Sequence, residues 1–438
     1  MLLNAADKAL WRLALPMIFS NITVPLLGLV DTAVIGHLDS PVYLGGVAVG
    51  ATATSFLFML LLFLRMSTTG LTAQAWGAKD PQRLARALVQ PLALALGAGV
   101  LIILLRLPLI DLALHIVGGS EAVLEQARRF LEIRWLSAPA SLANLVLLGW
   151  LLGVQYVRAP VILLVVGNLL NIVLDLWLVM GLRMNVQGAA LATVTAEYAT
   201  LIIGLLMAKR VLTLRGVSLA MLKNAWRGDL RRLLALNRDI MLRSLLLQLC
   251  FGALTVFGAR LGSDIVAVNA VLMTMLTFTA YALDGFAYAV EAHSGQAYGA
   301  RDGSQLLEVW RAACRQSGMV ALAFALIYSL AGQYIIALLT SLPSLQQLAD
   351  RYLIWQTILP VVGVWCYLLD GMFIGATRGA EMRNSMAVAA AGFAVTLLTL
   401  PVLGNHGLWL ALAVFLALRG LSLALIWRRH WRRGTWFS

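Results

Sequence analysis

A single carboxylate stands in an apolar stretch near the start of the chain. In "VPLLGLVDTAVIGHLD" (24–39), Asp31 follows seven uncharged residues and precedes seven more before the next acid. An ionisable group in mid-bilayer costs at least a few kcal/mol and usually marks an ion or substrate pathway. The alternative is that Asp31 is hydrogen-bonded to a neighbouring helix and only holds the two together. A helix here has one polar face, formed by Ser20, Thr23 and Asp31.

Two prolines accompany this face. Pro16 and Pro25 each remove one backbone donor, so either can bend a helix that contains it. A bent helix has two ways of packing, which is the property that a gate needs.

A second polar face lies further along the chain. Asn168, Asn171 and Asp175 have the i, i+3, i+7 spacing of one helix face in a segment otherwise rich in Leu, Ile and Val. Three aligned polar groups in such a segment predict a wet cavity. Thr193 and Glu197, at i and i+4 in the next segment, are candidates to complete it. For Glu197 a pairing with Arg183 or with a group at the end of a span is an equal alternative.

The composition places these residues in a membrane. Of 438 residues, 61% are hydrophobic and 12% are charged, against roughly 25% charged in soluble proteins. Apolar runs reach the roughly 20 residues that a spanning helix needs, and a chain in lipid must satisfy its own backbone hydrogen bonds. We therefore predict an all-α integral membrane protein with twelve spans, near 13–36, 44–72, 87–109, 128–153, 159–181, 187–208, 239–261, 265–292, 317–340, 353–376, 385–403 and 407–427.

The basic residues orient the spans and divide the chain. With both termini in the cytoplasm, 22 of the 33 Lys and Arg residues fall on inside segments and seven on outside ones, as expected for cytoplasmic loops. The net charge of +13 is thus spread over loops, and we expect no nucleic-acid partner. We predict an N-terminal six-helix half (1–208), a basic cytoplasmic linker (209–238), and a C-terminal six-helix half with a basic tail (239–438).

The two halves carry an internal repeat. The polar heptad "QAWGAKD" (74–80), which we interpret as a loop, recurs 222 residues later as "QAYGARD" (296–302). The same offset places "GWLLG" (149–153) on "GMFIG" (371–375). Six spans per half preserve orientation, so the halves should be two six-helix bundles related by a pseudo-two-fold axis along the membrane normal. Transporters built in this way bind substrate between their halves and rock them.

These features together resemble the multidrug and toxic compound extrusion (MATE) family, and most closely its DNA-damage-inducible branch. The resemblance covers essentially the whole chain and rests on the duplicated heptad and on "LALPMIFSN" (13–21), "VDTAVIGHLDS" (30–40) and "GNLLNIVLDLWLV" (167–179). It implies a multi-pass antiporter of the bacterial inner membrane that exports amphipathic, often cationic compounds against an inward flow of protons or sodium ions. It assigns uptake of the coupling ion to Asp31, Asn171 and Asp175.

The resemblance also suggests how coupling would work. Protonation from outside would remove the need of Asp31 for hydrogen-bond donors, and the first helix could then repack and release the drug outward. Deprotonation to the cytoplasm would reset the cycle.

Acids of the second half offer another cation site. Asp284 lies in span eight and Asp370 in span ten, and some relatives place sodium in this half with an acid of span seven. Span seven offers only Gln248, Ser244 and Arg243 where such an acid would be wanted, which favours protons over sodium. Asp370 could instead pair with Arg378 or Arg243.

Other functions fit less well. A flippase for a lipid-linked precursor, from the same broad superfamily, would need a groove rich in Arg and Lys. An intramembrane enzyme would need a catalytic dyad or a metal motif, and none is present in the sequence. A passive channel would need a filter ring. We expect no cofactor and no metal, membrane lipid and small amphipathic molecules as the only partners, and a monomer.

Overall fold

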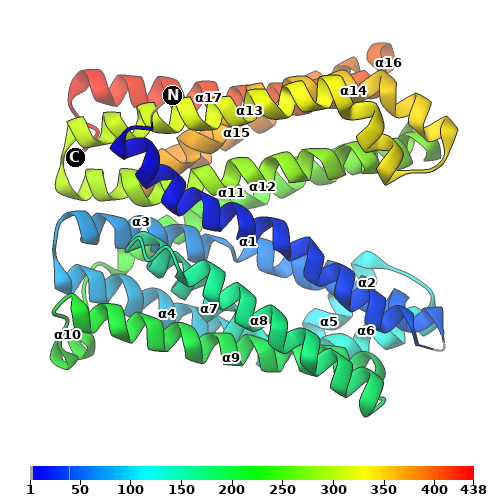
Figure 1. Ribbon diagram of the computed structural model, residues 1–438, viewed down its shortest axis with the longest axis horizontal. Helices are drawn as coiled ribbons and strands as arrows, with labels where there is room; N and C mark the ends of the chain where they lie inside the picture. Colours follow the sequence, from blue (N-terminus) through cyan, green and yellow to red (C-terminus); the bar gives the residue numbers. More distant parts are fainter. Residues whose placement is uncertain (1–2, 39, 226) are drawn as a thin grey trace. The chain divides into compact units, whose positions relative to one another are not determined.

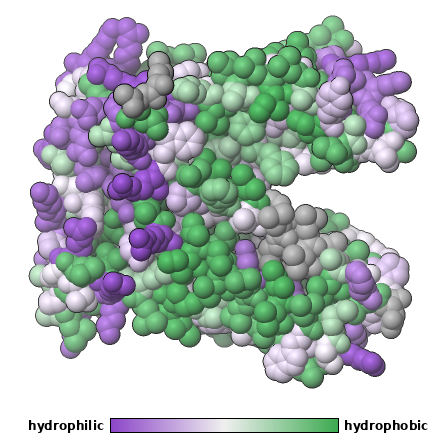
Figure 2. All heavy atoms as spheres, in the orientation of Figure 1, coloured by the Kyte–Doolittle hydropathy of each residue, from purple (hydrophilic) through white to green (hydrophobic). Residues whose placement is uncertain are grey.

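The chain is built from long helices. The computed structural model describes residues 3–38, 40–225 and 227–438, and residues 24–32 by their backbone alone. Within these ranges the secondary structure is helical, with no strand. Eleven helical segments there are long and apolar enough to cross a membrane, and the 32-residue helix α1 (Ala5–Gly36) precedes them. Figure 2 shows hydrophobic atoms over the middle of the helices and hydrophilic atoms gathered towards their ends. The predicted all-α membrane fold is confirmed.

The helices form two compact units, Ile22–Leu234 and Met1–Asn21 with Ala235–Ser438 (Figure 1). One break falls within the predicted linker. The other falls inside α1, between Pro16 and Pro25, so that the first turns of α1 belong with the C-terminal helices, which the sequence did not predict. The first unit contains α2 (Pro41–Leu60), α3 (Phe63–Gly77), α4 (Pro81–Leu104), α5 (Arg106–Val117), α6 (Glu121–Arg134), η1 (Trp135–Ser137), α7 (Ala138–Gly153), α8 (Ala159–Asp175), η2 (Leu176–Gly181), α9 (Asn185–Leu214) and α10 (Leu219–Asn224).

The second unit contains the C-terminal helices. They are α11 (Leu230–Arg260), whose first turn belongs to the other unit, α12 (Ser263–Ala300), α13 (Gly303–Leu339), α14 (Pro343–Gly375), α15 (Gly379–Thr396), η3 (Leu397–Thr399), α16 (Leu400–Leu403) and α17 (Asn405–Arg433).

Several predicted spans are interrupted. The span predicted at 44–72 is two helices, α2 and α3, with a break at Leu61 and Leu62. The span at 87–109 ends early, because α4 stops at Leu104 and the short helix α5 begins at Arg106. Pro108 fits in the first turn of α5, where no intrahelical donor is required. Hydropathy reports the apolar length of a segment and is insensitive to such changes of direction.

The duplicated heptads adopt the same structure. The prediction that they are simple loops is wrong, because each heptad begins as the last turn of a helix, α3 or α12. Lys79 and Arg301 then take left-handed conformations, with φ of 55° and 54°. Asp80 and Asp302 follow as N-caps of α4 and α13, and their amides donate to the carbonyl five residues earlier at 3.2 and 3.0 Å. The repeat found in the sequence is therefore also a repeat of hydrogen bonds.

The paired glycines repeat a helix contact in each unit. A β-carbon added to Gly149 of α7 would lie 2.5 Å from the carbonyl oxygen of Arg65 on α3. A β-carbon added to Gly371 of α14 would lie 2.7 Å from that of Ala287 on α12. All four positions obey the 222-residue offset. These glycines let two helix backbones touch, as small residues do in membrane proteins.

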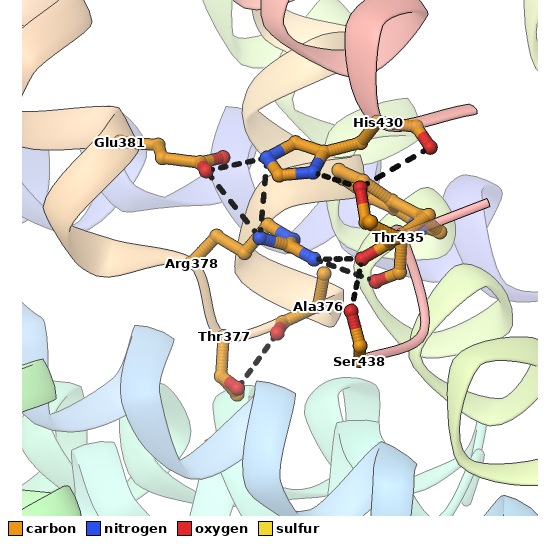
Figure 3. Close-up of polar contacts among 8 residues, drawn as sticks. Ala376, Thr377, Arg378, Glu381, His430, Thr435 and Ser438 are labelled. Carbon is orange, nitrogen blue, oxygen red and sulfur yellow. Dashed lines mark hydrogen bonds and ion pairs between the residues drawn. The ribbon is translucent and has the colours of Figure 1, made fainter. Parts of the chain in front are cut away.

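The C-terminal residues fold back onto the second unit (Figure 3). Trp436 is 2% exposed, and its ring meets the edge of Phe373 with centroids 5.1 Å apart. The guanidinium of Arg378 donates to the carbonyl of Trp436 at 2.7 Å. Beside it, Nε2 of His430 lies 2.7 Å from Oε1 of Glu381. These contacts join the start of α15 to the end of α17.

Candidate functional site

Helix α8 exposes apolar side chains and buries polar ones. Its exposed face carries large apolar side chains, among them Val165, Leu169 and Val173. Its polar side chains are turned inward: Asn171 is 3% exposed and Asp175 is 1% exposed. A helix with this pattern faces lipid on one side and a protein interior with polar groups on the other. Of the predicted polar face of this span, Asn171 and Asp175 are buried in the first unit and Asn168 is half-buried.

Asp175 lies where the helix changes its winding. The α-helical pattern ends at Asp175, and η2 continues as a π-helical turn in which the amide of Leu182 donates to the carbonyl of Trp177 at 2.9 Å. π-helical turns are rare and frequently mark functional sites. One turn earlier, the buried Oδ1 of Asn171 accepts no hydrogen bond from the described residues. Nothing in the sequence predicted this turn.

Helix α9 runs antiparallel to α8, and two close approaches fix their register. A β-carbon on Gly188 would lie 3.1 Å from the carbonyl oxygen of Leu178, and one on Gly167 would lie 2.9 Å from Oγ1 of Thr200. The predicted residues of both helices lie in the stretch between these two points: Asn168, Asn171, Asp175, Thr193 and Glu197.

Within this group Thr193 and Glu197 have identified partners. The Thr193 hydroxyl donates to the carbonyl of Ala189 in its own helix at 3.2 Å. Oε2 of Glu197 accepts from Asn144 of α7 at 3.1 Å, and Oε1 lies 3.9 Å from Arg134. The pairing with a span-end basic group is therefore the alternative that the structure supports for Glu197. Asn144 was not predicted as a partner of Glu197, although it is the only side-chain amide in the apolar run "SLANLVLLGW".

The first helix is described only in part. Pro16 lies within α1 without ending it. The side chains of Asp31 and Pro25 lie outside the described part of the chain, so their predicted roles stay predictions.

Asp370 lies in an ion cluster of the second unit. Oδ2 of Asp370 is 2.7 Å from Arg243 of α11 and also accepts a hydrogen bond from Arg419 of α17. All three side chains are at most 10% exposed. Pairing with Arg243 was one predicted alternative and is confirmed. The alternative prediction, that Asp370 pairs with Arg378, was wrong, and Arg419 was not predicted as a partner of Asp370.

Two guanidiniums beside one carboxylate argue against a cation site at Asp370, because an incoming cation would meet a local excess of positive charge. Asp284 of α12, the other candidate in this half, is half-buried.

Apolar helices with buried polar residues, arranged in a duplicated bundle, are features of secondary transporters. A family model described as MatE matches residues 16–177 and 240–403. The chain belongs to the MATE family, and it is a transporter and not an enzyme.

Relatives cover nearly the full length of the chain. DNA damage-inducible protein F of Escherichia coli (strain K12) is 87% identical over 436 residues, which cover 100% of this chain and 95% of the relative. The probable multidrug resistance protein NorM of Acinetobacter baylyi is 23% identical, with 96% of this chain and 94% of the relative covered.

Solved structures share the fold. Crystal structures of MATE in the bent and in the straight conformation each superpose with a TM-score of 0.84, at 23% and 22% identity. In both comparisons 98% of this chain and 96% of that chain are covered. These matches extend over all the predicted spans.

Proposed function

We propose that the protein is a multidrug efflux antiporter of the bacterial inner membrane. It exports amphipathic, often cationic compounds in exchange for protons that enter through the first unit. The observation that carries the proposal is the buried polar face of α8, which ends at Asp175 where the helix becomes π-helical. The name of one relative, a probable multidrug resistance protein, agrees with a role in export.

Protons are favoured over sodium by the charges in the two units. Sodium requires several oxygen ligands, whereas one buried carboxyl group suffices to carry a proton. Asp370, the acid that would serve a second-half sodium site, is held by two arginines. Asp175 and Asp31 are the acids that we assign to coupling, with Asn171 and Asn168 on the same face of α8.

Coupling is proposed to act through α1. The helix contains Pro16 and Pro25, and the boundary between the two compact units falls between them. The superposed MATE structures are described as bent and straight. A bend of α1 at its prolines would link protonation in the first unit to release of the exported compound.

The test is transport of a fluorescent cation into proteoliposomes. An imposed pH gradient should drive it, a sodium gradient should not, and replacing sodium by potassium should leave the rate unchanged. Asp31→Asn and Asp175→Asn should each lower the proton-driven rate at least ten-fold, while the exposed acid Asp264, changed to Asn, serves as the matched control. Wild-type rates in both the Asp31 and the Asp175 variants would refute the assignment, and transport driven by sodium alone would refute proton coupling.

A further inference from the structure

Three arginines line a pocket at one end of the Ile22–Leu234 unit. Arg83 and Arg86 lie in the first two turns of α4, and Arg232 lies in the first turn of α11. Apolar groups form the rest of the wall, together with one amide and one acid: Leu71, Ala87, Gln90, Pro91, Asp229 and Leu233. The pocket is thus amphipathic, with guanidinium groups beside hydrocarbon.

The segment between α10 and α11 closes one side of this pocket. Gly228 and Asp229 both have left-handed conformations, with φ of 93° and 48°, so the chain turns back onto α4. The Gly228 carbonyl accepts a hydrogen bond from Nε2 of Gln90 at 2.6 Å. The carboxylate of Asp229 lies 3.6 Å from Arg86. These contacts fix the linker to the helix that carries two of the arginines.

The pocket has an excess of positive charge. Asp229 is the one acid among the lining residues, and its side chain is 69% exposed. The nearby Asp80 is engaged as an N-cap, since it accepts hydrogen bonds from the amides of Gln82 and Arg83. The buried Nε of Arg86 has no hydrogen-bond partner among the described residues. Guanidinium groups offer donors in a planar fork that matches phosphate oxygens.

The repeated fold does not require these arginines. At the 222-residue offset, the positions of Arg83 and Arg86 are occupied by Gln305 and Glu308. The C-terminal copy forms the same helix start behind its N-cap, Asp302, without them. The basic charges are therefore a local addition to the N-terminal copy and not part of the helix–helix framework.

The geometry points to a binding site for the phosphate group of an anionic phospholipid. The pocket lies at the ends of membrane-spanning helices, where headgroups are found, and basic pockets of this kind between spanning helices bind anionic headgroups. The wall of Leu71, Pro91 and Leu233 suits the hydrocarbon of a lipid better than a free phosphate ion. The site is separate from the polar face of α8 and does not depend on the proposed transport mechanism.

A lipid titration of the full-length protein in detergent tests this site. The thermal unfolding midpoint is followed against added phosphatidylglycerol, phosphatidylcholine or inorganic phosphate. Phosphatidylglycerol should raise the midpoint saturably, and the double variant R83Q/R86Q should need about 25 times more of it for half-saturation, about five-fold per arginine. The matched control is Arg231→Gln, which removes an exposed arginine beside Arg232 that does not line the pocket.

Four results of this titration would overturn the inference. They are an unchanged titration in the double variant, an equal loss in the Arg231 control, an equal response to phosphatidylcholine, and saturation by inorganic phosphate at the concentration that suffices for the lipid.

A second variant guards against misfolding of the first. Asp229→Asn removes the competing carboxylate and should lower the half-saturating concentration by about three-fold, a gain that misfolding cannot produce. Unchanged or weaker binding in that variant would also count against the site.

Discussion

Replacing Asp370 by Asn should destabilise the C-terminal unit strongly. The change keeps the shape of the side chain but leaves Arg243 and Arg419 buried without their counter-charge. At an effective dielectric constant of about 20, unit charges 2.7 Å apart attract by about 6 kcal/mol, and desolvation offsets part of this. Removing one partner of a buried ion pair typically costs about 3–5 kcal/mol. We expect a loss of that size in the free energy of unfolding.

The assay is thermal or denaturant unfolding in detergent micelles, followed by tryptophan fluorescence. Asp350→Asn, an exposed acid on the same helix, is the control and should change little. Adding Arg243→Met to Asp370→Asn should recover part of the loss, because one uncompensated charge is then removed. A stable Asp370→Asn protein that has lost ion-driven transport would refute this reasoning, since it would show that the carboxylate serves an ion and not the two arginines.

Three further substitutions probe the framework. Gly371→Val should cost about 1–3 kcal/mol of unfolding free energy, because its β-carbon meets the Ala287 carbonyl; an unaltered unfolding midpoint would contradict the close contact of α12 and α14. Asp302→Ala removes the N-cap of α13 and should cost about 1 kcal/mol of unfolding free energy, measured in the same way. The Asp350→Asn control should lose no unfolding free energy. Trp436→Ala should cost about 3–5 kcal/mol and expose the C-terminal residues to carboxypeptidase; resistance equal to wild type would show that the ring does not hold them.

The sequence predicted those features that repeat within one helix or at one fixed distance along the chain. Twelve spans, the 222-residue repeat and the polar face of α8 all depend on local spacing, and the structure contains each of them. The linker prediction also included one of the breaks between the two units.

The remaining features depend on contacts between distant segments. Arg419 is 49 residues from Asp370 in the chain, and no spacing rule connects them. The π-helical turn after Asp175 is a change in hydrogen-bond register, which side-chain patterns do not report. The first turns of α1 belong with the C-terminal unit because Trp11 packs on Phe286 and bonds to Gln316, contacts that hydropathy cannot detect.

The same 222-residue offset separates the two heptads and the two segments that carry the paired glycines. The chain therefore has the same length from residue 74 to residue 153 as from residue 296 to residue 375. Neither copy has gained or lost a net residue there, so each half is a built-in reference for the other. Where the counterparts agree, the same helix contact is formed twice. Where they differ, as the buried Arg65 differs from Ala287, exchanging the residues between halves would show whether the difference matters for transport.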